Sequence, residues 1–447
     1  MRNIFLIIMT ASIGIIFYKV IDVYRRNISL QEYFLMNGNL KPGNFIGTMV
    51  STNLSLGNFL YFCAIWSYFY GVTGMLWIAI GVILMIISFA IFGPKFKNFI
   101  EDRDNTGTIH EYLSLSYPTS SLYVGPMKLR LIASLSTIIT ITLAIVLELQ
   151  LASQILAIII GKQPWIIFFV VSAIACFVAA VGGYLGVAVT DSIQAILLGL
   201  ALIAFFFIIF FDTITAANYS PAYPLNISEI IGSIGWWNIA SIIVFGIGWP
   251  LVTMDTWQRN SASRSLSTAS KGIIISGILM LIAVLGWSMV GIYDKLALSS
   301  LASHSQGFDP FSDLFLIATN TTIVKWSSAI LATGLIMAAL STADTFFVMS
   351  GHSIVSDLII GVLRRGSYGS LTNEQNLFFT NISRALIAFQ WFIVLGVWFL
   401  LKDFGILQSA LSLFFAAYAV QYSLLIPVLL SKPGISKQSG PAFWAIA

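Results

Sequence analysis

The sequence predicts an all-α integral membrane protein that crosses the bilayer about eleven times. Of its 447 residues, 58% are hydrophobic and only 9% are charged, whereas soluble domains carry roughly 25% charged residues. Apolar stretches of about 20 or more residues recur along the chain, and each is long enough to cross the bilayer core as a helix. The short segments of alternating polarity that are typical of a membrane β-barrel are absent from the sequence.

The apolar stretches place the helices in order along the chain. An extra amino-terminal helix is expected at residues 3–24. Ten core helices follow, at roughly 43–70, 73–93, 127–160, 164–181, 184–211, 235–258, 270–293, 322–361, 376–401 and 404–430. Residues 431–447 form a tail or begin a further helix near Pro441 that the chain is too short to complete, as in a truncated protein. Residues 1–447 are therefore expected to form a single transmembrane domain.

The distribution of basic residues tests this count and predicts the orientation. With the amino terminus outside, the inner segments carry 15 basic residues and the outer segments carry 5, as the positive-inside rule requires. The inner residues are Arg25, Arg26, Lys41, Lys95, Lys97, Arg103, Lys128, Arg130, Arg259, Arg264, Lys271, Arg364, Arg365, Lys432 and Lys437. The outer ones are Arg2, Lys162, Lys295, Lys325 and Lys402.

Several classes of function find no support in the sequence. The net charge of +4 is not gathered into the basic face that nucleic-acid binding requires. Cys63 and Cys176 lie in apolar segments, and His110, His304 and His352 are far apart, so neither a disulfide framework nor a metal cluster is expected. No constellation of nucleophile and base appears, and an enzyme is therefore not expected.

Two core helices are interrupted by residues that form helices poorly. The first core helix contains the run GTMVSTNLSLGN at positions 47–58, which predicts an unwound segment whose carbonyl groups point at a cation. Close packing of helices through small residues is the alternative. The sixth core helix contains Gly246 and Pro250, which predict a kink or break there. Equivalent breaks five helices apart are typical of an inverted repeat.

The eighth core helix carries a polar patch in the middle of a long apolar stretch. Helical spacing places Ala338, Ser341, Thr342 and Thr345 on one face, with Asp344 beside it. Hydroxyl and carbonyl oxygens suit a hard cation such as sodium. Hydroxyls bonded to carbonyl groups one turn earlier are the alternative for the serine and threonines, but this alternative does not account for the carboxylate.

Two further acids lie inside predicted helices. Asp191 lies about 9 Å along the fifth core helix at 1.5 Å per residue, where it either binds a cation or accepts hydrogen bonds from the backbone. Glu148 in the third core helix has no partner that the sequence identifies.

The order of these segments resembles that of the sodium:solute symporter family, which includes sodium/proline, sodium/galactose and sodium/sialic acid symporters. The resemblance covers nearly the whole chain. It rests on an outside amino terminus, residues 32–40, the segment from Gly182 through Thr190, Asp191 and Gln194, the triplet Trp257-Gln258-Arg259, and the Ala338, Ser341 and Thr342 motif.

The resemblance implies a LeuT-like fold of two inverted five-helix repeats, here residues 43–211 and 235–430. It implies a sodium-coupled symporter that imports a small polar organic solute by alternating access, with Na⁺ as coupling ion. The family's main sodium site maps onto the carbonyl groups of Ser51 and Leu54, the carbonyl of Ala338, and the hydroxyls of Ser341 and Thr342. A second cation site in some members maps onto Asp191, Ser341, Asp344 and Thr345, where the extra carboxylate either strengthens sodium binding or carries a proton.

The expected substrate contacts are Asn53, Asn58 and Trp249. The sugar-binding acid of the family has no counterpart around Trp77, which favours a small amino acid, a carboxylate or another polar solute. The expected location is the plasma (inner) membrane, with lipid, sodium and the solute as partners. A sensory or receptor module that keeps a transporter-like membrane domain is the alternative function, and a passive channel is disfavoured because no ring of repeated polar residues appears.

Overall fold

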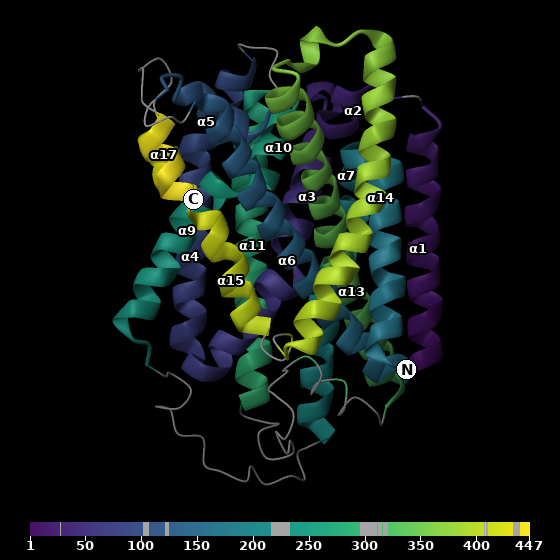
Figure 1. Cartoon of the computed structure of the whole chain (residues 1–447). Coiled ribbons are helices and arrows are strands. Elements are labelled where there is room, and N and C mark those ends of the chain that lie inside the picture. Colours follow the sequence, from purple (N-terminus) through teal and green to yellow (C-terminus); the bar gives the residue numbers. More distant parts are fainter. Residues whose placement is uncertain are drawn as a thin grey trace.

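The protein is an elongated bundle of helices in the computed structural model. The structure describes residues 1–26, 28–101, 107–120, 125–215, 233–295, 311, 315, 321–405, 407, 410–431 and 439–447. Within these residues the chain is helical and contains no β-strand beyond one isolated bridge between Leu40 and Ser263. Most of the long helices run up or down one common axis (Figure 1).

The extra amino-terminal helix forms as predicted. Helix α1 (Arg2–Tyr24) lies on the flank of the bundle, where it packs against α7 (Figure 1). One of its faces is buried, and a Cβ added at Gly182 of α7 would lie only 3.3 Å from Val20 of α1. On the opposite face, Ile7 is 70% exposed and Tyr18 is 71% exposed, as expected for a helix that contacts lipid.

Two very long helices each take part in two crossings. Helix α4 (Tyr61–Glu101) has 41 residues and α7 (Pro164–Thr215) has 52, which as straight rods would be about 60 and 80 Å long against a bilayer core of about 30 Å. Each helix contains a glycine at positive φ, Gly71 (φ 57°) and Gly183 (φ 55°). Chain reversal at Gly71 brings Gly74 so close to Trp66 that an added Cβ would lie 2.7 Å from its carbonyl oxygen.

The remaining elements complete the expected architecture. They are α2 (Leu30–Leu35), η1 (Met36–Gly38), α3 (Pro42–Asn53), η2 (Leu56–Leu60), α5 (Ile109–Ser116), α6 (Pro126–Ile160), α9 (Trp236–Val252), α10 (Met254–Ala262), α11 (Leu266–Tyr293), α13 (Thr322–His352), η5 (Ser353–Leu363), η6 (Tyr368–Ser370), α14 (Asn373–Asp403), α15 (Ala410–Tyr422), α16 (Leu425–Leu430) and α17 (Ser439–Ile446). Eight helices are apolar and long enough to span a membrane, and the bent pair α9–α10 adds a ninth. Because α4 and α7 each fold back once, the described part of the chain makes eleven crossings, as predicted.

The structure differs from the predicted boundaries in a few places. Residues 94–126, expected to be a loop, contain the end of α4 and the short helix α5. Thr108 explains the start of α5, because its side chain accepts a hydrogen bond from the Glu111 amide and caps the helix. A helix also forms close to the expected start near Pro441, where α17 begins at Ser439.

Close packing through small residues holds the bundle together. A Cβ added at Gly291 of α11 would lie 1.8 Å from the Ala64 carbonyl oxygen of α4, and one at Gly334 of α13 would lie 2.7 Å from the Leu197 carbonyl of α7. Between apolar helices in lipid, such backbone approach replaces the hydrophobic driving force that acts in water.

Gly291→Ala is therefore expected to destabilise the protein, because the new methyl group overlaps the backbone of Ala64. Overpacking of this kind typically costs about 1–3 kcal/mol. The matched control is Gly396→Ala in α14, whose added Cβ meets no atom within 4 Å. Melting temperatures in detergent should fall for the first variant and stay level or rise for the second, and equal melting temperatures would contradict this account of the packing.

Candidate functional site

The first core helix is broken near its middle, as the run at positions 47–58 predicts. Helix α3 ends at Asn53, Leu54 leaves helical geometry (φ −86°, ψ 44°), and Ser55 is extended (φ −61°, ψ 147°) before η2 begins at Leu56. Ser51, Leu54 and Ser55 are at most 2% exposed. The break therefore places unpaired backbone groups in the buried interior of the bundle.

A carboxylate from α6 satisfies the amide groups on one side of the break. The Glu148 carboxylate accepts hydrogen bonds from the backbone amides of Gly57 (2.9 Å) and Asn58 (2.8 Å), and from the Asn58 side-chain amide (2.5 Å). Glu148 is fully buried. A negative charge at the start of a helix is favourable because the free amides there carry partial positive charge. Glu148 therefore anchors the second half of the broken helix.

The polar patch of α13 faces the other side of the break. Ser341 Oγ lies 2.5 Å from Asp191 Oδ1 and 2.8 Å from Ser51 Oγ. Since a hydroxyl carries one proton, Ser341 donates to the carboxylate and accepts from Ser51. Thr342 Oγ1 lies 3.0 Å from the Ala338 carbonyl oxygen and 3.3 Å from that of Thr52.

Oxygen atoms from three helices, α3, α7 and α13, therefore lie close together. Thr342 makes the local bond to a carbonyl one turn earlier, which is the ordinary role of a threonine in a helix, but it also reaches the broken helix. Thr52 additionally approaches Thr345, with 3.3 Å between the two hydroxyl oxygens. Ser51, Ala338, Ser341 and Thr342 are fully buried. Leu54 marks the break itself, and Ser51 and Thr52 on its amino-terminal side make the hydrogen bonds to α13.

Asp191 of α7 connects this cluster, through Thr48, to α10. Its carboxylate accepts hydrogen bonds from Ser341 and from Thr48 of α3, and Thr48 Oγ1 in turn lies 3.3 Å from Arg259 Nε of α10. Arg259 also pairs with Asp255 one turn earlier in α10. The three charged residues are at most 3% exposed, so Arg259 offsets only one of the two carboxylate charges of this buried network.

Asp344 lies beside the network with an unused oxygen atom. It is 1% exposed and interacts electrostatically with Asp191. Among the described residues, Asp344 Oδ1 has no hydrogen-bond partner. A buried carboxylate in this position calls for a cation or a proton to neutralise it.

Two of the three expected substrate residues contact each other. Trp249 Nε1 donates to Asn53 Oδ1 (3.2 Å), while Asn53 Nδ2 donates to the Met49 carbonyl (2.8 Å). The side-chain amide of Asn58 is instead engaged by Glu148. Asn58 remains a predicted substrate contact through Oδ1, which has no partner among the described residues.

The sixth core helix is broken, but three residues beyond the predicted segment. Helix α9 ends at Val252, Thr253 is extended (φ −83°, ψ 125°), and α10 starts at a bend of 46°. Pro250 lies inside α9. Gly246 has a packing role, because a Cβ there would lie 2.4 Å from the Gly81 carbonyl oxygen. The glycine permits the close contact with α4, and the chain departs from helical geometry at Thr253.

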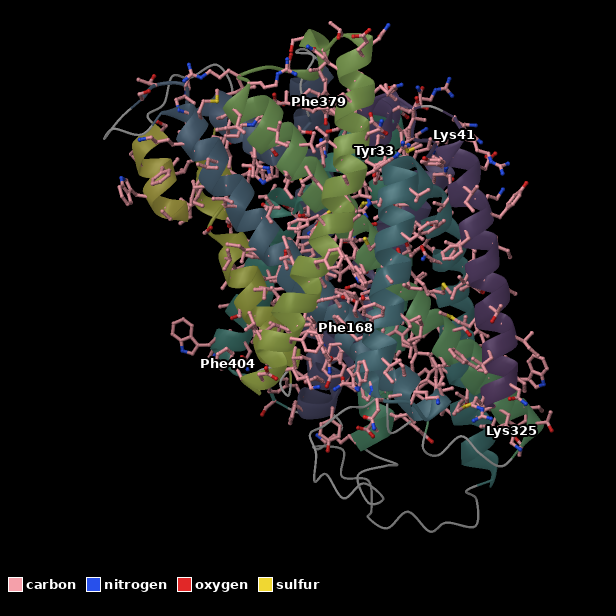
Figure 2. The ribbon with its side chains drawn as sticks, turned by 45° about the vertical axis from the view of Figure 1, so that its right-hand side comes forward. Tyr33, Lys41, Phe168, Lys325, Phe379 and Phe404 are labelled. Atoms are coloured by element: carbon pink, nitrogen blue, oxygen red, sulfur yellow. The ribbon has the colours of Figure 1, made fainter. Side chains whose placement is uncertain are left out.

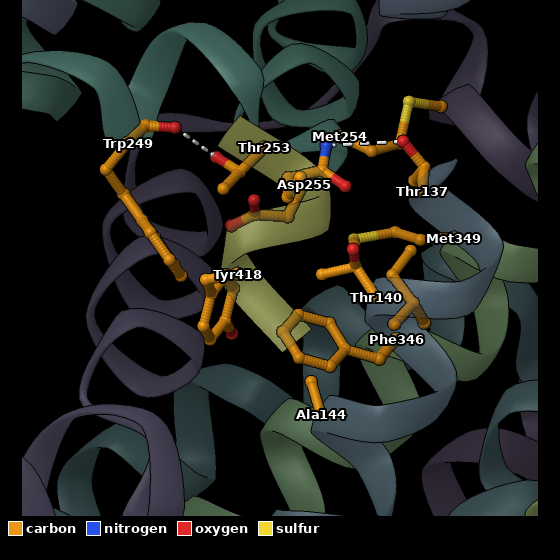
Figure 3. A pocket seen from close by; sticks show the side chains of 12 residues that line it. Thr137, Thr140, Ala144, Trp249, Thr253, Met254, Asp255, Phe346, Met349 and Tyr418 are labelled. Atoms are coloured by element: carbon orange, nitrogen blue, oxygen red, sulfur yellow. Dashed lines mark hydrogen bonds between the residues drawn. The ribbon is translucent and has the colours of Figure 1, made fainter. Parts of the chain in front are cut away.

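Cavities flank Trp249 on two sides. One small cavity is lined by Thr137, Thr140, Ile141, Ala144, Trp249, Thr253, Met254, Asp255, Phe346, Met349, Tyr418 and Gln421. Figure 3 shows Asp255, Trp249, Tyr418 and Phe346 around this space. The other small cavity includes Asn53, Met85, Phe89 and Met280 among its lining residues. Trp249, which is half-buried, lines both cavities.

Comparison with known proteins agrees with this geometry. The sequence profile described as the sodium:solute symporter family matches residues 33–419. The chain belongs to the sodium:solute symporter family. It is thus a multi-pass membrane transporter that carries a solute together with Na⁺ as the coupling ion. A search of curated protein sequences gave no match.

Solved structures share the fold of this symporter at low sequence identity. A substrate-bound, outward-open Na⁺-coupled sialic acid symporter is 18% identical, with a TM-score of 0.69 over 99% of this chain and 94% of that chain. Mhp1, a nucleobase-cation-symport-1 family transporter, is 10% identical, with a TM-score of 0.57 over 88% and 78%. A manganese transporter from Eremococcus coleocola is 10% identical, with a TM-score of 0.53 over 89% and 79%. The predicted LeuT-like fold is confirmed.

Sequence reasoning did not include Thr52 in the ion site and left Glu148 without a partner. Thr52 contacts α13 twice, and its place between the predicted ligands Ser51 and Leu54 was the available signal. Glu148 was noticed as an intramembrane acid, but its partners lie about ninety residues away in sequence.

Glu148→Gln is expected to loosen the break in the first core helix, because the amide presents one acceptor oxygen where the carboxylate presents two. Hydrogen bonds to charged groups contribute about 1.5–3 kcal/mol each, so the melting temperature in detergent should fall clearly. Gln150→Glu, a change at a half-buried position of the same helix, is the control for altered charge. A Glu148→Gln variant as stable as the wild type would contradict the anchoring role.

Proposed function

We propose that the symporter binds its main sodium ion between the broken first core helix and α13. The ligands are the carbonyl oxygens of Ser51, Leu54 and Ala338 and the hydroxyls of Ser341 and Thr342. The observation that supports this most directly is the pair of contacts across the break, Ser341 to Ser51 (2.8 Å) and Thr342 to the Thr52 carbonyl (3.3 Å). Hard oxygen ligands at a helix break are the usual arrangement for a coupling ion in such folds.

Sodium at this place would couple its gradient to solute movement. The ion would hold the broken helix against α13 and so organise the solute site that Asn53 and Trp249 line. One charge moving through 100 mV supplies ~2.3 kcal/mol, and a tenfold sodium gradient adds about 1.4 kcal/mol. One ion per cycle would therefore sustain a solute gradient of roughly several hundredfold, and two ions far more.

A second cation is proposed at Asp191, Asp344 and Thr345. The unpartnered Asp344 Oδ1 and its proximity to Asp191 support this site. The structure of the sialic acid symporter is described as revealing a novel Na⁺ site, which is compatible with more than one cation in a protein of this fold. The second cation is either sodium or a proton carried by Asp344.

The proposed orientation places the amino terminus outside a plasma (inner) membrane. Lys41 and Lys325, assigned to opposite sides by their sequence positions, lie at opposite ends of the bundle in Figure 2. The bias of basic residues toward one side supports this orientation, although Arg103, Lys432 and Lys437 of the inner set lie outside the described residues. The solute would thus be imported, as a small polar organic molecule.

Thr342→Ala is expected to raise the sodium concentration for half-maximal uptake about tenfold. The reason is the loss of one sodium ligand, taken as about 1.4 kcal/mol of binding free energy, which is the size of a typical net hydrogen bond. Thr333→Ala is the matched control, because Thr333 lies in the same helix and donates to the Ala329 carbonyl in the same way (2.8 Å), but makes no hydrogen bond to α3 among the described residues. Sodium titration of binding or uptake provides the measurement. Equal shifts in the two variants would count against the proposed ligand set.

Asp344→Ser is expected to remove the second cation. If that cation is sodium, the Hill coefficient of sodium activation should fall toward one; if it is a proton, the coupling to pH should disappear while sodium dependence remains. Asp403→Ser, at an exposed position at the end of α14, is the control. A variant that retains both the cooperativity and the pH response of the wild type would exclude Asp344 from coupling.

A further inference from the structure

The cavity between Trp249 and α6 carries one charge. Its twelve lining residues include Asp255 and no lysine, arginine or histidine. Asp255 is 3% exposed, and its Oδ2 is paired with Arg259, which does not line the cavity. Among the described residues, Oδ1 of the same carboxylate accepts no hydrogen bond. One acceptor of a buried carboxylate therefore remains available at the cavity.

A second unused acceptor comes from α15. Gln421 is 2% exposed, and its Nε2 donates to Thr137 Oγ1 (3.2 Å) and to the Val252 carbonyl. Because a carbonyl oxygen only accepts hydrogen bonds, the amide nitrogen must face Val252, which fixes the orientation of the side chain. Gln421 Oε1 is then left without a partner among the described residues. A buried acceptor in this condition requires a donor that the protein does not supply.

Aromatic rings complete the walls of the cavity. The rings of Trp249 and Tyr418 lie with centroids 4.7 Å apart at 55°, and Phe346 lies across the space from Asp255 in Figure 3. The faces of such rings attract cations and do not attract anions. The cavity therefore combines unsatisfied acceptors with aromatic walls and lacks a positively charged side chain.

We propose that the solute of this symporter carries a protonated amino group, which Asp255 and Gln421 bind in this cavity. A primary ammonium group supplies the N–H donors that both free acceptors need, and its charge suits the aromatic walls. A solute whose only charge is negative finds no counter-charge there. The inference rests on the proposed sodium-coupled uptake of a polar organic solute and narrows the class of that solute to amines and amino acids.

The test is a thermal-shift screen of the purified full chain with pairs of compounds that differ at one group. Amino acids are compared with their 2-hydroxy acids, such as alanine with lactate, and small amines with the matching alcohols, such as putrescine with 1,4-butanediol. Each pair is measured in sodium and in potassium, because a ligand of the native state raises apparent stability. Stabilisation in sodium by one or more amines, without stabilisation by their hydroxyl partners, is the expected result.

The outcomes separate this proposal from the function on which it rests. Sodium-dependent stabilisation by a hydroxy acid or a neutral solute, or by no amine at all, would overturn the amine assignment and leave sodium coupling intact. A protein whose stability is equal in sodium and potassium, with and without solutes, would instead contradict the proposed sodium site.

A matched pair of variants tests the residues. Gln421→Met should weaken binding of the identified amine at least tenfold and preserve the stabilisation by sodium alone. Gln390→Met is the control, since Gln390 of α14 is also buried, also lacks side-chain partners among the described residues, and does not line the cavity. Equal amine affinity in the two variants would overturn the role of Gln421.

Asp255→Asn is the corresponding change at the carboxylate. It also removes the partner of buried Arg259, so its folding is checked first by its stabilisation in sodium. In a folded variant, loss of the discrimination between an amine and its hydroxyl partner is expected, whereas unchanged discrimination would exclude Asp255 from amine binding. If the variant does not fold, the Gln421 pair decides the question.

Discussion

The architecture depends on satisfying the backbone groups that an interrupted helix exposes inside a membrane. Hydrogen-bonding groups without partners are costly where water is absent, so a break survives only if nearby side chains complete it. Here Glu148 binds the amides after the break, and Thr342 approaches the Thr52 carbonyl before it. Both partners come from helices that also pack closely against each other and against α7. The interruption and the surrounding bundle therefore stabilise each other.

The same constraint explains why the site is a network rather than a set of separate ligands. Ser341 contacts both Ser51 and Asp191, and Thr48 connects Asp191 to Arg259 in α10. Four helices, α3, α7, α10 and α13, thus share a chain of polar contacts. A change at any link alters the electrostatic environment of the others, because the interior screens charge weakly. Such a network gives the ion site a physical connection to α10, the second half of the broken sixth core helix.

Much of this fold follows from local properties of the sequence. Long apolar segments and the alternation of basic residues were sufficient to place eleven crossings, and the polar run at positions 47–58 was sufficient to place the break in the first core helix. The position of the second break was less accessible, because Gly246 serves the contact with Gly81 and the chain bends only at Thr253. The partner of Glu148 was not predictable, since helix periodicity contains no information about which distant helix a side chain will meet. The shape of a cavity also depends on tertiary packing. The free acceptor oxygens of Asp255 and Gln421 could therefore be identified only from the structure.

Trp249 has a kinetic consequence beyond its contact with Asn53. It belongs to the walls of two cavities, so a change in its side-chain torsion would alter the boundary between them. Because the indole is half-buried and donates a hydrogen bond to Asn53, such a change must first break that bond and is expected to be slower than the picosecond-to-nanosecond flips of exposed side chains.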